Sequence, residues 1–162
     1  MIIRDATVLD LSDLTRTYNQ AVLSTAATLD VEAQTLEQRS EWFSHYGDKY
    51  PLLVAEISGR VVGYCSISRY RTKPGYDRTV ESSVYVDAAF HGRGIGRELM
   101  REALHRASDI GYHVVIAGIT EGNDASVRLH ASLGFQHVGR LREVGRKFDQ
   151  WQDVNFYELV LT

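Results

Sequence analysis

Three local patterns follow one another between residues 79 and 107, and their order most limits how this chain can fold. In TVESSVYV (79–86), Val80, Ser82, Val84 and Val86 alternate with other residues, which is typical of a strand with one buried face. The segment HGRGIG (91–96) follows with three glycines. A run with apolar residues on one helical face comes next. The order predicts a strand, a glycine-rich loop and a helix.

The other segments also alternate between strand and helix patterns. Thr35 and Gln38 form a capping box that predicts the start of a helix, and Ser58-Gly59 predicts a hairpin turn. Helices are expected at about 10–24, 35–46, 97–107 and 123–133, and strands at 2–6, 51–57, 61–68, 79–86, 114–119, 135–141 and 155–161. The sum is a mixed α/β fold.

Length and composition narrow the classes of protein that fit. A chain of 162 residues, 44% hydrophobic, predicts one domain over residues 1–162. A net charge of -3 gives no basic excess for nucleic-acid or membrane partners. Cys65 is the single cysteine, so no intrachain disulfide can form, and we expect it to pack as a small apolar residue. With no signal-peptide or membrane-spanning pattern, we expect a cytoplasmic protein.

The glycine segment has two interpretations on spacing alone. Free backbone N–H groups at a helix start can bind an anion, glycines let a diphosphate approach, and Arg93 and Arg97 add positive charge. A tight turn without a ligand would need the same glycines. The segment lacks the Gly-Lys-Ser/Thr of a Walker loop, and Arg97 stands where a dinucleotide fingerprint needs its third glycine.

HGRGIG resembles the Gln/Arg-x-x-Gly-x-Gly/Ala loop of the Gcn5-related N-acetyltransferase (GNAT) family, with His91 in the Gln/Arg place. GNDASVRLHASLGF (122–135) is similar to the family's Asn-x-x-Ser/Ala…Gly-Phe segment on the fourth helix. Together with TVESSVYV and WQDVNF, it most resembles the phosphinothricin and methionine sulfoximine acetyltransferase branch. The resemblance implies an α/β (α+β) GNAT fold, with a mixed, mostly antiparallel sheet splayed at strands four and five and flanked by helices.

The resemblance also implies acetyl-CoA as cosubstrate. In the family, strand-four backbone groups hold the pantetheine arm where that strand separates from strand five; ordinary sheet pairing is the alternative. Asn123 would contact the arm, cap the helix, or do both. The implied cofactor-binding residues are Val84, Tyr85, Val86, His91, Gly92, Arg93, Gly94, Ile95, Gly96, Arg97, Asn123 and Ser126.

Two residues are catalytic candidates by the same resemblance. Glu81 matches the general base proposed for the branch, which would take the amine proton directly or through water. Its alternative is a solvated strand glutamate paired with Arg78. His130 stands where many relatives carry a tyrosine that protonates the leaving thiolate. It is otherwise a buried, hydrogen-bonded histidine or a cofactor contact, and a thiol with a pKa of about 8.5 leaves without much help.

The loop SRYRTKPGYDR (68–78) is a basic island in an acidic chain. Arg71 aligns with an arginine of the branch and would grip a substrate carboxylate, with Tyr76 as a pocket wall. Leu29 matches an apolar position near the family's substrate pocket. A solvated loop and an ordinary core leucine are the alternatives. The histidines show no metal-ligand spacing, so no metal is expected.

These observations predict an acetyl-CoA-dependent N-acetyltransferase that acts on the α-amine of a small amino-acid-like molecule. By similarity, the candidate substrates are phosphinothricin, methionine sulfoximine and methionine sulfone. A peptide N-terminal or polyamine acetyltransferase is the alternative enzyme, and a non-catalytic acetyl-CoA sensor is the alternative of another class. Members of the branch are commonly dimers, which implies a homodimer.

Overall fold

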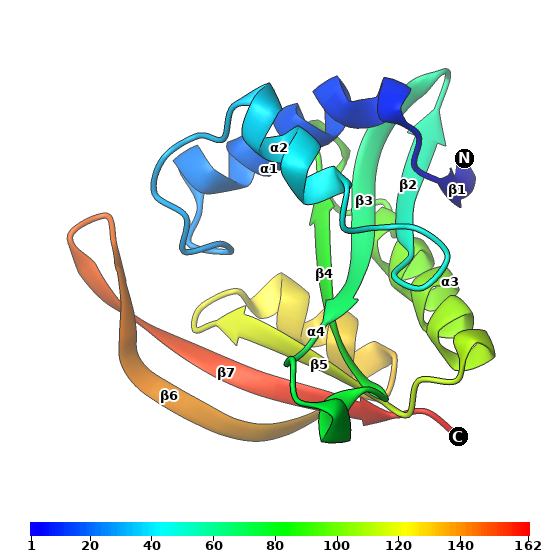
Figure 1. Ribbon diagram of the computed structural model, residues 1–162. Helices are drawn as coiled ribbons and strands as arrows, with labels where there is room; N and C mark the ends of the chain where they lie inside the picture. Colours follow the sequence, from blue (N-terminus) through cyan, green and yellow to red (C-terminus); the bar gives the residue numbers. More distant parts are fainter.

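The computed structural model describes all 162 residues and consists of a seven-stranded sheet with helices on both faces (Figure 1). The helices are α1 (Leu11–Ser24), α2 (Leu36–Phe43), α3 (Ile95–Ile110) and α4 (Asp124–Ser132). The strands are β1 (Ile2–Asp5), β2 (Leu52–Ile57), β3 (Arg60–Arg69), β4 (Thr79–Val86), β5 (Val114–Thr120), β6 (Gln136–Lys147) and β7 (Gln150–Val160). The expected mixed α/β fold is confirmed.

Three element boundaries differ most from those expected. Strands β6 and β7 form a hairpin that reaches beyond residue 141 on one side and begins before residue 155 on the other. Most residues of the β6 extension are exposed, so it lacks the apolar alternation that marks a strand in sequence. Helix α2 ends at Phe43, although its Thr35–Gln38 capping box forms as predicted.

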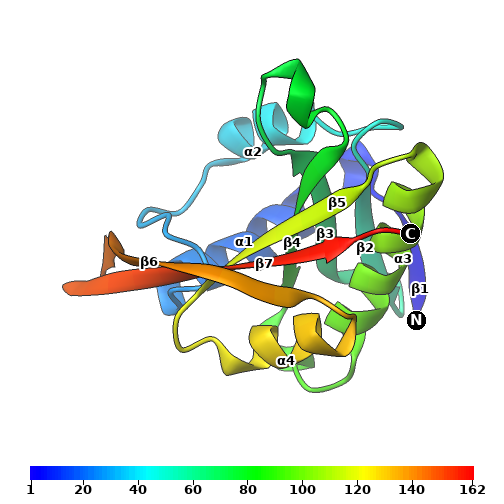
Figure 2. The same cartoon turned by 90° about the horizontal axis from the view of Figure 1, so that it is seen from below.

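The sheet has the strand order β1-β2-β3-β4-β5-β7-β6, and only the β4–β5 pair is parallel. That pair joins residues 79–81 to residues 114–116 and extends no farther. Beyond this point the two strands diverge, while β5 stays paired with β7 as far as Thr120 (Figures 1 and 2). The expected splay between the fourth and fifth strands is therefore present.

The two faces of the sheet carry different cores. On the α3 face, Ile67, Val80, Leu99 and Met100 are fully buried, and Cys65 packs among them as predicted. On the other face, α1 packs on the sheet through a smaller cluster, which comprises Leu14, Tyr18, Val22, Leu52, Val54, Val61 and Tyr64. Successive side chains of a strand point to opposite faces of the sheet. The side chains of β3 and β4 that alternate with the core residues therefore face α1 and α2.

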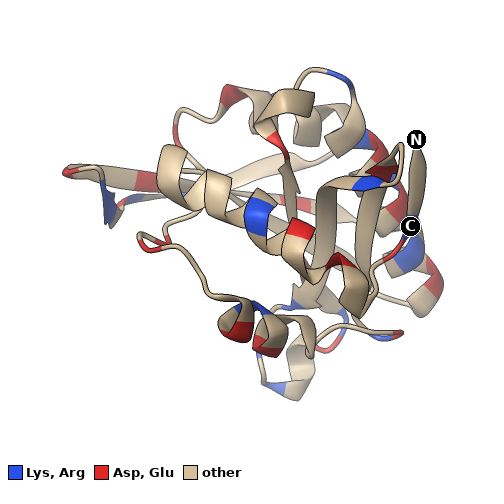
Figure 3. Cartoon of the chain, turned by 90° about the horizontal axis from the view of Figure 1, so that it is seen from above, with Lys and Arg blue, Asp and Glu red and all other residues tan.

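Charged residues of both signs lie on several elements in the view of Figure 3, in keeping with the net charge of -3. None of the helices combines the length and the apolar composition needed to cross a membrane.

Candidate active site

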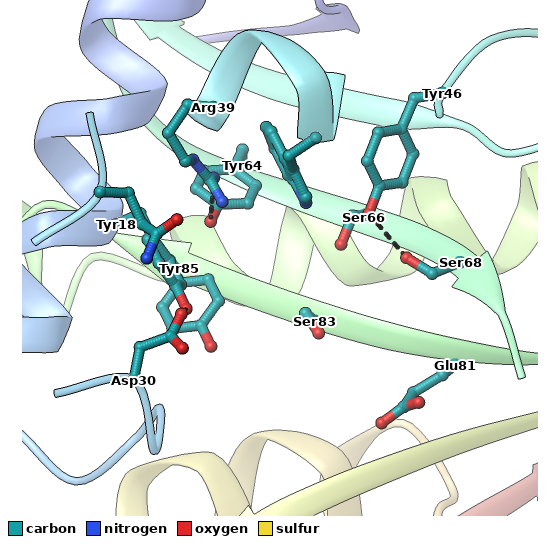
Figure 4. Close-up of a pocket in the computed structure, with 12 residues that line it drawn as sticks. Tyr18, Asp30, Arg39, Tyr46, Tyr64, Ser66, Ser68, Glu81, Ser83 and Tyr85 are labelled. Carbon is teal, nitrogen blue, oxygen red and sulfur yellow. Dashed lines mark hydrogen bonds between the residues drawn. The ribbon is translucent and has the colours of Figure 1, made fainter. Parts of the chain in front are cut away.

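A cavity of about 360 Å³ lies between β3 and β4 on one side and α1, α2 and the segment that joins these helices on the other (Figure 4). Its walls are rich in hydroxyl groups and hold both signs of charge. The residues that line it are Tyr18, Asp30, Gln34, Arg39, Trp42, Tyr46, Tyr64, Ser66, Ser68, Glu81, Ser83 and Tyr85.

The strand side of the cavity is a ladder of directly opposed residues from β3 and β4. The pairs are Tyr64 with Tyr85, Ser66 with Ser83, and Ser68 with Glu81. Directly opposed residues of an antiparallel pair share one face, which brings these six side chains into a single wall. The prediction that Glu81 projects away from the buried Val80 face is confirmed.

Glu81 is a half-buried carboxylate with neither an ion pair nor a side-chain hydrogen bond. The predicted alternative, pairing with Arg78, is wrong: the Arg78 Nη1 group donates to the carbonyl of Gly111 at 2.8 Å. Burial disfavours the charged form and raises the pKa of Glu81 above its ordinary value of 4.5. A carboxylate with a raised pKa and a free acceptor edge is suited to take a proton from a ligand in the cavity.

The β4 backbone beyond Glu81 has polar groups that the sheet does not use. The amide of Asp87 donates to the carbonyl of Val62 on β3. Backbone groups of residues two apart on a strand point to the same side, so those of Tyr85 also point toward β3. Val84 and Val86 turn their backbone groups the other way, toward the gap left by β5. Backbone contacts to a ligand in this gap can come from Val84 and Val86. Tyr85 differs from the expectation, because it presents its side chain to the cavity instead.

The glycine segment forms the N-terminus of α3. Gly92 and Gly94 both have a φ of +76°, a left-handed conformation that L-residues other than glycine rarely adopt. Glu98 makes the first intrahelical bond, to Gly94, which leaves the amides of residues 95–97 without a helical partner. These amides and the helix dipole suit a diphosphate.

His91 and Arg93 lie beside this N-terminus. The His91 ring contacts the carbonyl of Val86 at 2.8 Å through Nε2, which must carry the proton because a carbonyl oxygen only accepts. The guanidinium of Arg93 lies 4.8 Å from the ring centre of Phe90. The side chain of His91 thus donates to one of the free carbonyls of β4, and the amide of Val86 stays available to a ligand.

Helix α4 confirms the predicted cap at Asn123 and disfavours the acid role predicted for His130. The side chain of Asn123 caps the helix by accepting from the amide of Ser126 at 3.3 Å, as predicted. His130 is 3% exposed and packs edge-on against Phe135. Its Nδ1–H donates to the Ser126 carbonyl at 2.7 Å, and burial lowers the pKa of His130 below 6.5. Its Nε2 therefore carries no proton at neutral pH, which disfavours the general-acid role.

Three predicted substrate residues lie outside the cavity wall. Arg71 is exposed in the β3–β4 connection, with its guanidinium 5.0 Å from the Tyr70 ring centre. Tyr76 packs edge-on against the same ring and is 41% exposed. Leu29 lies against Gly145 of β6, where an added β-carbon would clash with the leucine side chain. Neither this connection nor Leu29 contributes a residue to the cavity lining, whereas Asp30 does.

Sequence reasoning missed Arg39 and the aromatic residues around it. Arg39 is 4% exposed, and its Nη2 donates to the hydroxyl of Tyr64 at 3.1 Å. Its guanidinium carbon lies 3.5 Å from the ring centre of Trp42, which is three residues ahead on α2. The Arg-x-x-Trp spacing places both side chains on one helix face and is the one signal that the sequence carried.

Residues 12–135 match the acetyltransferase (GNAT) family. Over 162 residues the chain is 41% identical to the L-methionine sulfoximine/L-methionine sulfone acetyltransferase of Salmonella typhimurium, with 99% of this chain and 95% of that protein covered. A phosphinothricin acetyltransferase from Sinorhizobium meliloti, solved in complex with acetyl-CoA, is 32% identical with a TM-score of 0.95 and coverages of 99% and 88%. A ribosomal-protein-alanine N-acetyltransferase from Brucella melitensis is 42% identical with a TM-score of 0.96 and coverages of 99% and 100%.

Proposed function

The chain belongs to the acetyltransferase (GNAT) family and is an acetyl-CoA-dependent N-acetyltransferase, and we propose that it acetylates the α-amine of a small amino-acid-like substrate. The phosphinothricin, methionine sulfoximine and methionine sulfone type fits best. The observation that carries the proposal is the unpaired Glu81 carboxylate in a cavity of about 360 Å³, on the strand that separates from β5. A cavity of this size suits a small molecule. The names of the Salmonella and Sinorhizobium proteins support the choice of substrates.

Acetyl-CoA supplies the activated thioester. In this proposal the free amides of residues 95–97 hold its diphosphate, with positive charge from Arg93 and Arg97 nearby. The backbone of Val84 and the amide of Val86 hold its arm in the gap between β4 and β5. One backbone N–H in this gap also polarises the acetyl carbonyl, because a fixed donor stabilises negative charge that develops on that oxygen.

The substrate amine must lose a proton before it can attack. Glu81 accepts that proton in this proposal, directly or through one water molecule, and its raised pKa makes it a stronger base. The thiolate needs no designated acid, because a thiol with a pKa of about 8.5 is an adequate leaving group. His130 then serves the packing of α4 through its bond to Ser126.

Peptide N-termini are the second candidate acceptor, and the name of the Brucella protein favours them. A polyamine is the third candidate acceptor: the carboxylates of Asp30 and Glu81 in the cavity wall favour it, and the buried cation of Arg39 opposes it. The sensor alternative is not retained, since the chain is an N-acetyltransferase.

A homodimer is also part of the proposal. The β6–β7 hairpin exposes several large apolar side chains to solvent. Such a cluster marks an interaction surface, and a partner subunit would cover it. These side chains are Val138, Leu141, Val144, Phe148 and Trp151.

The substrate proposal is tested by thiol release from acetyl-CoA, with one acceptor offered at a time. The panel contains methionine sulfoximine, methionine sulfone, phosphinothricin, common amino acids, a polyamine and a short peptide with N-terminal alanine. Saturable release with any of the first three, and mass-spectrometric detection of their N-acetyl products, is the expected result. Release with the peptide alone would contradict the small-substrate proposal.

A further inference from the structure

Arg39 is a buried cation without an anionic partner in the cavity wall (Figure 4). It is 4% exposed, and no carboxylate lies within ion-pair distance of its guanidinium. One hydrogen bond, from Nη2 to the hydroxyl of Tyr64, is formed, whereas the buried Nε has no partner at all. Most of the five N–H donors of this guanidinium are therefore unused.

The surroundings of Arg39 stabilise its charge only in part. The guanidinium carbon lies 3.5 Å from the ring centre of Trp42 and 4.2 Å from that of Tyr18, within range of cation–π attraction. Rings offer no lone pair to an N–H donor, so the hydrogen-bonding capacity stays unsatisfied. Asp30 lines the same cavity, and its carboxylate accepts from the Tyr18 hydroxyl without pairing with Arg39. An oxygen atom of a ligand would complete the site.

The position of Arg39 relative to Glu81 limits which oxygen atom of a substrate can bind to Arg39. Arg39 bonds to Tyr64, which opposes Tyr85, whereas Glu81 opposes Ser68. The two pairs are four residues apart along the ladder, about 13 Å at a strand rise of about 3.3 Å per residue. Figure 4 shows the two side chains at opposite ends of the cavity. The amine and carboxylate of one α-amino acid sit on a single carbon atom, so they suit two groups at opposite ends of the cavity less well than an amine and an oxygen at the end of a side chain.

We propose that Arg39 is a specificity-determining residue, which binds an oxygen acceptor near the far end of the substrate side chain while the α-amine points to Glu81. This inference rests on the proposed function and narrows it. The substrate class is an α-amino acid with a sulfone, sulfoximine or phosphinate group. The sulfur or phosphorus atom of this group is bonded to the second carbon of the side chain and carries the oxygen. Trp42 and Tyr18 provide aromatic surface for the methylene groups and the methyl group of such a side chain.

Methionine sulfone and methionine form a matched substrate pair, because they differ only in two oxygen atoms on sulfur. The test compares kcat/KM for both substrates in the wild type, Arg39→Met and Arg39→Lys. Methionine replaces the aliphatic stem of Arg39 but donates no hydrogen bond, and lysine keeps the charge without the planar fork. Arg101→Met is the control, since Arg101 is exposed on α3 and pairs only with Glu98.

The wild type is expected to prefer methionine sulfone. Arg39→Met should lower kcat/KM for the sulfone about 10- to 100-fold, mainly through KM, because hydrogen bonds from a charged donor are lost. The value for methionine should stay within about threefold, since no bond to its sulfur is removed. Arg39→Lys should give an intermediate loss, and Arg101→Met should give none.

Equal losses on both substrates would overturn the inference and give Arg39 a structural role alone. Unchanged sulfone kinetics in Arg39→Met would overturn it as well. Circular dichroism and Tm identify a misfolded variant, in which case Arg39→Lys carries the comparison. If the wild type acetylates the sulfone with no preference over methionine, the inference fails and the proposed function stands. If the wild type acetylates neither, the proposed function fails and the inference falls with it.

Discussion

Glu81 of β4 lies directly opposite Ser68 of β3, at the end of the cavity farthest from Arg39 along the strand ladder. The neighbouring Val80 points to the α3 core and is fully buried. One strand therefore anchors the sheet with one face and presents a free carboxylate to the cavity with the other. The carboxylate also sits where β4 stops pairing with β5, so the proposed base and the proposed arm-binding residues Val84 and Val86 lie close together on one strand.

The pH profile of kcat/KM should have an acidic limb that reports on Glu81. The base is active when deprotonated, and burial raises its pKa, so activity should fall as the pH drops through a midpoint above 4.5. Thiol release with methionine sulfone, measured across the acidic and neutral range, gives this midpoint. A limb centred at or below the ordinary glutamate value would contradict the burial argument.

His130→Ala should keep activity within about tenfold of the wild type, because the histidine lacks a proton to donate at neutral pH. The same change should lower Tm, since it removes a buried ring from the contact with Phe135. Steady-state kinetics and thermal unfolding measure the two effects. Complete loss of turnover in a folded variant that still binds acetyl-CoA would restore the general-acid role.

Gly94→Ala should destabilise the fold by about 1–2 kcal/mol, because a β-carbon is unfavourable at a φ of +76°. It should also raise KM for acetyl-CoA, since the loop leads into the free amides of α3. Gly47→Ala is the matched control: a β-carbon there meets nothing within 4 Å, and its φ is not left-handed. Equal effects of the two changes on acetyl-CoA binding would contradict a role for the loop conformation.

The proposed homodimer predicts a solution mass near twice 18.3 kDa by light scattering. Trp151→Asp should shift the mass toward that of the monomer, because Trp151 is 59% exposed on β7 and a buried charge would oppose association. A wild-type mass equal to that of one chain over the whole concentration range would exclude this part of the proposal.

Local patterns in the sequence were sufficient to predict several features of the fold. The alternation in residues 79–86 identified the face on which Glu81 lies, and the capping residues Thr35 and Asn123 act as expected. The splay of β4 from β5 followed from the family resemblance, because no local pattern encodes where two strands part. These features depend on neighbours in the chain or on motifs of fixed spacing.

Residues whose roles depend on distant contacts could not be predicted in this way. Arg39 reads as an ordinary helix residue until α2 packs over β3 and buries it beside Tyr64. Arg71 and Leu29 were assigned to the substrate pocket by resemblance, but Arg71 lies beside Tyr70 and Leu29 against Gly145, so neither lines the cavity, and their substrate roles stay predictions. The length of the β6–β7 hairpin was also hidden, because its exposed residues have no apolar alternation.

The most direct test of the central claim is the rate of thiol release by Glu81→Gln relative to the wild type, with methionine sulfone and saturating acetyl-CoA. Glutamine keeps the size of the side chain but cannot take a proton, so kcat should fall about 100-fold or more. The Kd for acetyl-CoA, measured on the same preparations, should be unchanged, since Glu81 lies on the cavity side of β4. A Glu81→Gln enzyme with wild-type kcat would contradict the assignment of Glu81 as the base.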